Sequence, residues 1–384
     1  MRFSRWVHWR LRGIQFSANR ARRSFPWRGA ADRLQAVNAV RPGHFKIWPL
    51  LVLGLVTCFY FRSPGVWAQP GAEDATFVPG FLQHGLVYAV ALQTNGNIVV
   101  SGDFVIGLTR PRLARLQPSG ALDRSFNIGD GANADVQAIL VQPDQRILVA
   151  GAFTRFNRTD KLYLARLLPD GSVDASFAPD SFFSFVNALA VQPDGKILVG
   201  GARGLYRLLP DGKVDPAFAP TLRDFAVTVL ALLPDGKILA NGPSPDAHRL
   251  KRLIPDGSMD TNFVVEVSSV EALAVQPDSK LLVVGKFDSS ATLVRRFLAD
   301  GPPDPGFAPV TLRSSYAFPP TTLARTIFSL PDGKAIVAGE FYYVNDLTRG
   351  GIARLNADGS LDADFDTLRD DPEFMAALGK RSGV

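Results

Sequence analysis

The chain has 384 residues, a formal net charge of +6 and one cysteine, Cys58. Twelve of its 42 Lys and Arg residues precede residue 69, which leaves 30 basic against 35 acidic residues in positions 69–384. The basic excess belongs to the N-terminal segment, so the remainder has no positive surplus that would favour nucleic acid. Residues 69–384 contain no cysteine, so burial of apolar surface rather than disulfides must stabilise them.

The first 68 residues follow the order of a secretory signal. Residues 1–46 form a basic leader, residues 47–61 carry no charge, and small residues lie near Ala68. These fifteen uncharged residues are fewer than the roughly 20 that a membrane span needs. We expect residues 47–68 to be a signal segment cleaved after Ala68, which predicts a secreted, periplasmic or cell-surface protein. A membrane anchor retained in the mature protein is the alternative.

A tight turn between short apolar runs recurs six times between Asn95 and Asp332. Its third copy, residues 186–201, reads VNALAVQPDGKILVGG. Runs rich in Val, Ile and Leu and bounded by Pro, Asp and Gly are typical of strands. Asp-Gly supplies the positive φ of a hairpin turn, so each copy predicts two strands joined by a hairpin.

A second element alternates with the first, and residues 164–177 show it as LARLLPDGSVDASF. The two elements together predict units of about four strands, and units of 40–50 residues with four strands are typical of β-propeller blades. We expect the final Phe of each D-x-x-F to pack between adjacent sheets. The aspartates of D-x-x-F lie 41 to 58 residues apart, at Asp123, Asp174, Asp215, Asp260, Asp304 and Asp362.

The predicted fold is therefore all-β, a β-propeller of about six four-stranded blades over residues 69–366. A half-copy, Asp74–Phe77, precedes the first unit. A closed ring removes exposed strand edges, and the half-copy would compete with Asp362–Phe365 for the closing position. We favour a six-bladed ring with one spare strand at the rim. A seven-bladed ring that lacks most of one blade and an open array are the alternatives.

The repeated pattern A-L-A-V-Q-P-D-G-K-I-L-V-G-G-x-F, followed by L-A-R-L-x-x-D-G-S-x-D-x-x-F, resembles the bacterial delta-60 repeat, a propeller-type repeat. The resemblance covers residues 71–366 and rests on six tandem copies. It implies an exported protein with propeller blades, and it implies no known reaction, ligand or active-site residue. The third and fourth copies depart from the pattern after the second strand, where they read GGARGLYRL and NGPSPDAHRLKRL.

Outside the turns, the sequence contains few residues that could act in catalysis or bind a metal ion. His84 and His248 are the only histidines after the leader, and they lie in different units. No metalloprotease, phosphate-binding or serine-hydrolase motif is present, so we expect no metal, no cofactor and no catalytic residue. The repeated D-G-S-x-D has too few carboxylates for a calcium loop. We expect its first Asp to form the turn and its second Asp to cap the following bend.

Loops after the second strand of three units are longer than the others. They combine aromatic, Arg and Asn side chains, which suit a protein or carbohydrate ligand. Ordinary solvated loops are the alternative. The candidate ligand-contact residues are Arg155, Phe156, Asn157, Arg158, Tyr342, Tyr343, Asn345 and Arg349.

Residues 367–384 form a tail in which Asp371 and Pro372 predict the start of a short helix and Gly379 its end. Taken together, these features predict an exported, non-enzymatic binding or scaffold module. One alternative is a propeller enzyme of lyase, lactonase or quinoprotein type that uses the central channel. Another is a structural fragment of a cell-surface repeat array. The ligand and the oligomeric state do not follow from the sequence.

Overall fold

The computed structural model describes residues 74, 77, 83–106, 111–180, 184–222, 225–242, 249–287, 291–314 and 323–365. None of residues 1–73 and none of residues 366–384 is among those described. The predicted leader, the signal segment and the helix of the tail therefore lie outside the described residues. No helix within the described ranges is long and apolar enough to cross a membrane.

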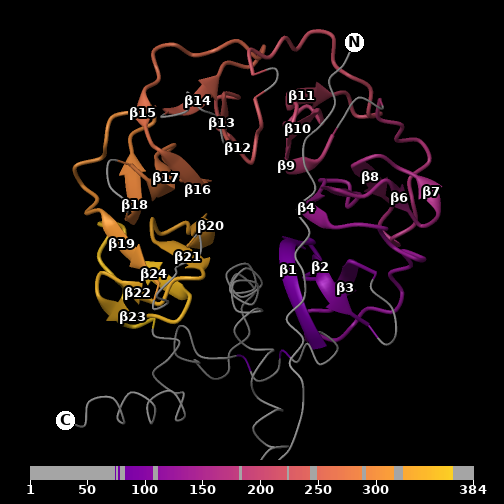
Figure 1. Cartoon of the computed structure of the whole chain (residues 1–384), viewed down its shortest axis with the longest axis horizontal. Helices are drawn as coiled ribbons and strands as arrows, with labels where there is room; N and C mark the ends of the chain where they lie inside the picture. The colour runs from indigo at the N-terminus through magenta and orange to yellow at the C-terminus, as the bar shows by residue number, and fades with distance from the viewer. Residues whose placement is uncertain are drawn as a thin grey trace, which may run out of the picture. The chain divides into compact units, whose positions relative to one another are not determined.

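The strands form six successive sets, which we call units A to F (Figure 1). Unit A holds β1 (Gln83–Leu92), β2 (Ile98–Val105) and β3 (Leu113–Leu116), and unit B holds β4 (Val136–Val141), β5 (Ile147–Gly151), β8 (Leu164–Leu167) and the hairpin β6 (Arg155–Phe156) and β7 (Thr159–Asp160). Unit C holds β9 (Val186–Val191), β10 (Ile197–Gly201) and β11 (Gly204–Leu208), and unit D holds β12 (Val229–Leu232), β13 (Ile238–Asn241), β14 (Arg249–Leu253) and β15 (Val265–Glu266). Unit E holds β16 (Ser269–Val275), β17 (Leu281–Lys286), β18 (Thr292–Phe297) and β19 (Val310–Arg313). Unit F holds β20 (Ala324–Ser329), β21 (Ala335–Gly339), β24 (Ile352–Leu355) and the hairpin β22 (Tyr343–Val344) and β23 (Leu347–Thr348).

The sheets of units A, B and C and the sheet β20–β21–β24 of unit F have three antiparallel strands. The sheet of unit D has four strands, and the sheet of unit E has six because β22 and β23 extend it beyond β19. The predicted fourth strand, which ends in D-x-x-F, contributes only a single bridge, such as Leu167 to Val173 in unit B. It does not extend further because the chain bends at Asp174, whose carboxylate accepts the backbone N–H of Ser176 at 2.9 Å. This bend confirms the capping role expected for the second Asp of D-G-S-x-D.

The first strand of each unit is its innermost strand, and consecutive innermost strands contact one another from β1 through β4, β9, β12 and β16 to β20 (Figure 1). Between β20 and β1 the described residues make no comparable contact. The fold is all-β and propeller-like. The number of blades and the closure of the ring stay predictions.

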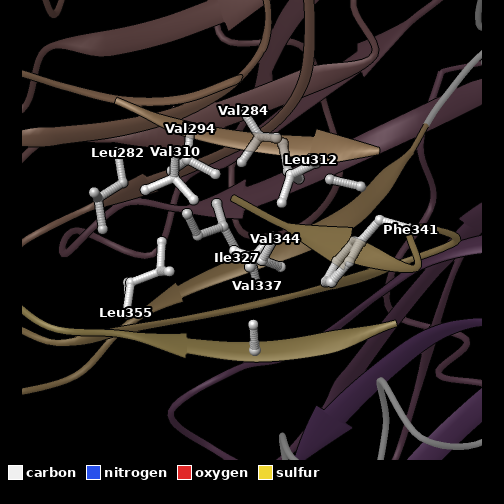
Figure 2. Close-up of a cluster of buried hydrophobic side chains, with 14 of the residues drawn as sticks. Leu282, Val284, Val294, Val310, Leu312, Ile327, Val337, Phe341, Val344 and Leu355 are labelled. Atoms are coloured by element: carbon white, nitrogen blue, oxygen red, sulfur yellow. The ribbon is translucent and has the colours of Figure 1, made fainter. Parts of the chain in front are cut away.

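One hydrophobic cluster fills each junction between consecutive units. At the E–F junction, Leu282 and Val284 of unit E pack with Val337 and Leu355 of unit F (Figure 2). Phe307, the last residue of unit E's D-x-x-F, belongs to the same cluster, which confirms its predicted position between sheets. The middle strands are apolar at nearly every residue because both of their faces are covered in this way.

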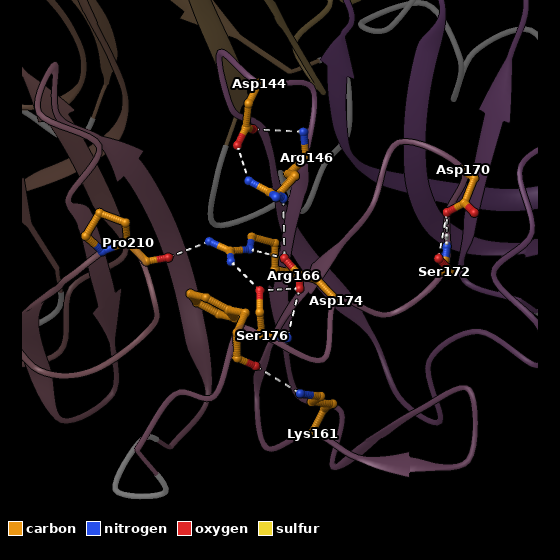
Figure 3. Close-up of polar contacts among 10 residues, drawn as sticks. Asp144, Arg146, Lys161, Arg166, Asp170, Ser172, Asp174, Ser176 and Pro210 are labelled. Atoms are coloured by element: carbon orange, nitrogen blue, oxygen red, sulfur yellow. Dashed lines mark hydrogen bonds and ion pairs between the residues drawn. The ribbon is translucent and has the colours of Figure 1, made fainter.

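A buried arginine joins each of these phenylalanines to the next unit. In unit B, the Nε of Arg166 donates to the Asp174 carboxylate at 2.7 Å, and its guanidinium lies 4.5 Å from the Phe177 ring centroid (Figure 3). Its Nη1 donates to the backbone carbonyl of Pro210 in unit C at 2.5 Å. Charge-assisted bonds of this kind are stronger than neutral ones. The same bonds to the next unit are made by Arg115, Arg207, Arg252 and Arg296.

Candidate functional site

The innermost strand of unit B begins with a β-bulge. Val136 pairs with Gly151 and Ala138 pairs with Ala150, so Gln137 has no opposing residue. A bulge interrupts the ladder and re-aims the side chain of the extra residue. Gly151 is required here because a Cβ on it would lie 2.1 Å from the carbonyl oxygen of Asp135.

The same bulge recurs within the innermost strand of units A, C, E and F. In unit D, Thr228 holds the equivalent place just before β12, and its N–H donates to Asn241 at 2.8 Å. Because the units repeat one strand order, these positions are equivalent in the six innermost strands. We call the six residues the bulge residues: Tyr88, Gln137, Asn187, Thr228, Glu271 and Arg325.

The bulge residues are all polar and all different, whereas the residues on either side of them repeat as Val and Ala in most units. Thr228 and Arg325 are exposed, and the other four are half-buried. A repeated backbone device that carries six unlike side chains can present an irregular, hydrogen-bonding surface. That combination is what a ligand site on a regular scaffold requires.

Two bulge residues are bonded to the adjacent unit. One Glu271 oxygen accepts the N–H groups of Leu323 and Ala324 of unit F, each at 2.8 Å, and the other accepts the Thr292 hydroxyl at 3.1 Å. The Asn187 side-chain amide donates to the Val227 carbonyl at 3.2 Å. Glu271 and Asn187 therefore hold neighbouring innermost strands together.

The other four make fewer bonds to neighbouring units, and the Thr228 hydroxyl donates to the Asn241 carbonyl of its own unit at 3.4 Å. Gln137 makes no side-chain hydrogen bond with any other described residue, and Arg325 pairs at the surface with Glu340. Burial raises the pKa of Tyr88, and the carboxylates of Asp135 and Asp103 raise it further. Tyr88 is therefore a neutral hydrogen-bond donor near pH 7.

The candidate residues of the unit B hairpin have mixed environments. Phe156 is fully buried and packs in the A–B cluster, so it is a core residue rather than the ligand contact that the sequence suggested. Asn157 adopts a φ of +46° and accepts the N–H of Asp130 at 3.3 Å, so it fixes the turn. Arg155 and Arg158 are exposed, and each forms an ion pair, with Asp160 and Asp130 respectively.

The unit F hairpin has the same design. Asn345 also has a φ of +46°, and its side-chain oxygen accepts the N–H of Thr311 at 2.8 Å. Arg349 is 8% exposed, so it offers little surface to a ligand. The rings of Tyr342 and Tyr343 meet edge to face with centroids 5.0 Å apart, and both are half-buried.

The two hairpins belong to different sheets, because β6 and β7 form a sheet of their own and β22 and β23 extend the sheet of unit E through β19. The bulge residues were missed in the sequence. The signal that could have found them is one position of the repeat, between Val and Ala in V-x-A-L-A-V, that holds only polar and unlike residues. Within the described ranges, no cluster of three His, Cys, Asp or Glu side chains could hold a metal ion.

Five segments of the chain match the family described as a domain of unknown function (DUF5122) beta-propeller, namely residues 93–126, 142–177, 192–218, 276–307 and 330–365. Each segment runs from a hairpin turn to the Phe of D-x-x-F. The chain is a propeller-type repeat protein. The narrower assignment to the delta-60 repeat remains an expectation, and unit D falls outside the matched segments.

Several solved structures are similar to this repeat protein at low sequence identity. A catalytically inactive virginiamycin B lyase from Staphylococcus aureus, solved with quinupristin, matches with a TM-score of 0.50 and 13% identity over 74% of this chain and 86% of that one. The WD40 beta-propeller domain of Doa1 matches with a TM-score of 0.49 and 13% identity over 66% and 76%. A putative gluconolactonase matches with a TM-score of 0.42 and 16% identity over 68% and 87%. No curated protein matches the sequence.

Proposed function

We propose that this protein is an exported, non-enzymatic binding module, and that its ligand contacts the bulge residues. The observation that carries the proposal is the recurrence of one bulge in successive units with a different polar side chain on each. Export rests on the predicted signal in residues 1–68.

The environments of these side chains favour binding over acid–base catalysis. A general base needs a carboxylate or imidazole that can reach the substrate. Glu271 is the one carboxylate among the bulge residues, and hydrogen bonds from unit F and from Thr292 already engage both of its oxygens. Tyr88, Gln137 and Thr228 stay neutral near pH 7 and offer donors and acceptors. They suit a neutral, hydrogen-bonding ligand such as a carbohydrate or a peptide segment.

A binding screen with matched variants tests this proposal. Full-length protein is screened by thermal shift against neutral oligosaccharides and against short peptides, and each hit is titrated by calorimetry. We expect hits to lose affinity at least fivefold in Gln137→Ala and Thr228→Val. Arg155→Ala and Arg158→Ala are the controls, because these exposed side chains lie on the unit B hairpin, and they should leave affinity unchanged.

The reverse pattern would contradict the proposal. Hits that lose affinity only in the hairpin variants would move the site to the loops suggested by the sequence. Turnover of a hit, detected as a new product by mass spectrometry and abolished by Tyr88→Phe, would make the protein an enzyme instead.

A further inference from the structure

The hairpin turn of unit A, which joins β1 to β2, lacks the charges of its counterparts. In units B to E an aspartate of this turn is followed two residues later by a cation that contacts two carboxylates. In unit B, Arg146 lies 2.6 Å from Asp144 and 3.4 Å from Asp174, the aspartate of D-x-x-F (Figure 3). The same two carboxylates are bridged in units C, D and E by Lys196, Lys237 and Lys280. Unit A has Asn95 and Asn97 at the positions of the turn aspartate and the cation.

The neutral turn of unit A keeps the backbone bond of the charged turns. The Asn95 side-chain oxygen accepts the N–H of Asn97 at 3.0 Å. The turn aspartates of the other five units accept the N–H two residues further on at 3.1 to 3.2 Å. A carboxylate at position 95 would therefore fit the turn. It would lie near Asp123, as the turn aspartates of units B to E lie near theirs, but no cation would bridge the two carboxylates because position 97 is an asparagine.

Asn95 is followed by Gly96, and an Asn-Gly pair favours a covalent reaction. Asn is one of the chemically labile residues of proteins, because the backbone nitrogen of the next residue can attack its side-chain carbon Cγ. Glycine has no Cβ, so its nitrogen is less hindered than that of any other residue. Asn95 is exposed, so water reaches it.

We propose that Asn95 is a site of spontaneous deamidation. The Gly96 nitrogen gives up its proton and forms a bond to the Asn95 Cγ. The bond from Cγ to Nδ2 breaks, and the side-chain NH2 group leaves with that proton as ammonia. One water molecule then opens the resulting succinimide ring. Cleavage at one of the two ring carbonyls gives an aspartyl residue, and cleavage at the other gives an isoaspartyl residue.

Both products should disturb unit A. Each adds a negative charge near Asp123, whose ion-pair partner in the described part of the chain is Arg115. The isoaspartyl product also lengthens the backbone by one carbon inside the turn. Gly96 N donates to Gln93 O at 3.0 Å and Gln93 N donates to Asn97 O at 2.8 Å, and an added carbon changes the spacing of both bonds. Deamidation should therefore loosen the connection between β1 and β2.

The sequence contains one other Asn-Gly pair, Asn241 and Gly242, and its environment is the opposite. Asn241 is 3% exposed and pairs with Val229 in the ladder of β12 and β13. The Gly242 nitrogen keeps its proton in a hydrogen bond to the Asn241 side-chain oxygen at 2.5 Å. Strand pairing restricts the rotation that the attack needs, and burial excludes the water that opens the ring. This pair is therefore an internal control for the reaction.

The site is tested by incubating the full-length protein at pH 8 and 37 °C and following its tryptic peptides by mass spectrometry. Conversion replaces an amide NH2 by OH and so changes the peptide mass. We expect residue 95 to convert at least tenfold faster than residue 241. Gly96→Gln is the matched variant, because unit B has Gln145 at this place with a φ of +67°. The added side chain should slow the conversion of residue 95 at least fivefold.

Three results would overturn the proposal. Equal rates at the two asparagines would show that the reaction takes place in unfolded chains. Absence of conversion at residue 95 over four weeks would show that the folded turn prevents the attack. An unchanged rate in Gly96→Gln would show that access to the backbone nitrogen does not determine the reaction. These measurements do not involve the bulge residues, so their outcome is independent of the proposed ligand site.

The effect of the new charge is tested with variants that do not depend on the reaction. Asn95→Asp should lower the Tm by about 2 °C, because two carboxylates then share no bridging cation. Adding Asn97→Lys to Asn95→Asp copies unit C, where Lys196 bridges Asp194 and Asp215, so the Tm should return to that of the parent protein. Equal Tm values for Asn95→Asp and the parent protein would contradict the expected effect of the charge.

Discussion

Gly151 lies against Asp135 at the point where unit B enters its innermost strand, and a Cβ on Gly151 would lie 2.1 Å from the Asp135 carbonyl oxygen. That oxygen accepts the N–H of Ala152 at 2.9 Å. Gly285 and Gly339 have the same relationship to Ser269 and Leu323, at 1.9 and 2.1 Å. A glycine at this position is therefore the sequence determinant of the bulge that carries Gln137 and its counterparts.

Gly151→Ala should destabilise the protein by about 1–3 kcal/mol, because backbone atoms rather than a flexible side chain must move to admit the methyl group. The measurement is urea unfolding followed by fluorescence. Gly306→Ala is the matched control, since its Cβ would meet only side-chain atoms at 3.3 Å or more and unit C has Ala217 at the same position. Equal unfolding midpoints for the two variants would show that the bulge does not need glycine.

Replacing the buried arginine should lower the free energy of unfolding more in unit A than in unit B. Arg115→Met leaves Asp123, which has no second ion-pair partner among the described residues. Arg166→Met leaves Asp174 with Arg146 still 3.4 Å away. Breaking a buried pair costs about 3–5 kcal/mol when the remaining charge is uncompensated. We expect a loss in that range for Arg115→Met and a smaller loss for Arg166→Met, measured by urea unfolding.

The serine contacts of the two aspartates are the same, which makes the comparison a controlled one. An equal or larger loss in the unit B variant would mean that the second cation contributes nothing. Asn97 takes the place of that cation in unit A.

The D-x-x-F aspartates should make the protein sensitive to acid. Burial alone would raise the pKa of Asp174, but hydrogen bonds from Ser176 and Arg166 outweigh it and hold the pKa below the ordinary value of 3.8. The folded state thus favours the ionised form. Its contribution to stability is complete well above pH 3.8 and is lost as the pH falls through the lower pKa of the folded state. All six D-x-x-F aspartates, at positions 123, 174, 215, 260, 304 and 362, show the same direction of shift.

Unfolding free energies measured between pH 6 and pH 2.5 should therefore fall steeply below pH 4. Asp174→Asn removes one of these titrating groups, so its curve should be shallower over the same range even though its stability at pH 6 is lower. A variant curve parallel to that of the unmodified protein would show that this aspartate is not linked to folding.

Asn345 should stabilise the folded protein through its backbone conformation and through the hydrogen bond that its side chain accepts from Thr311. Asn345→Ala loses both the tolerance of φ near +46° and the acceptor, so we expect a loss of about 2 kcal/mol. Asn345→Gly keeps the conformation and loses only the bond, so it should cost about 1 kcal/mol. If the glycine variant is the less stable of the two in thermal unfolding, the positive φ is not what selects asparagine here.

Most of the fold could be predicted from the repeated elements of the sequence. Strand pairs around Pro-Asp-Gly turns and the packing of Phe307 and its counterparts follow from local patterns that each unit repeats. The D-x-x-F segment was expected to be a full strand, but it forms a single bridge because it bends at its aspartate, and side-chain bonds such as that of Asp174 to Ser176 favour a turn over an extended strand. Those bonds depend on tertiary burial, which periodicity does not reveal.

The candidate site could be predicted from the sequence only in part. Long loops with aromatic and polar residues suggested the hairpins, but Phe156 lies in the core and Asn157 fixes the turn. The hairpin sequence gives no sign that its Phe points inward, because a neighbouring unit provides the packing surface. Gln137 and the other bulge residues could be located only when the strand register showed which residue has no opposing partner.

Crystals of the full-length protein soaked with a panel of small polar fragments provide the most direct test of the proposed site, because the test does not require knowing the ligand. If the bulge residues form the site, fragments should gather beside Tyr88, Gln137 and Thr228 and displace ordered water there. Fragments that gather instead at the β6–β7 and β22–β23 hairpins, with none at the innermost strands, would contradict the account.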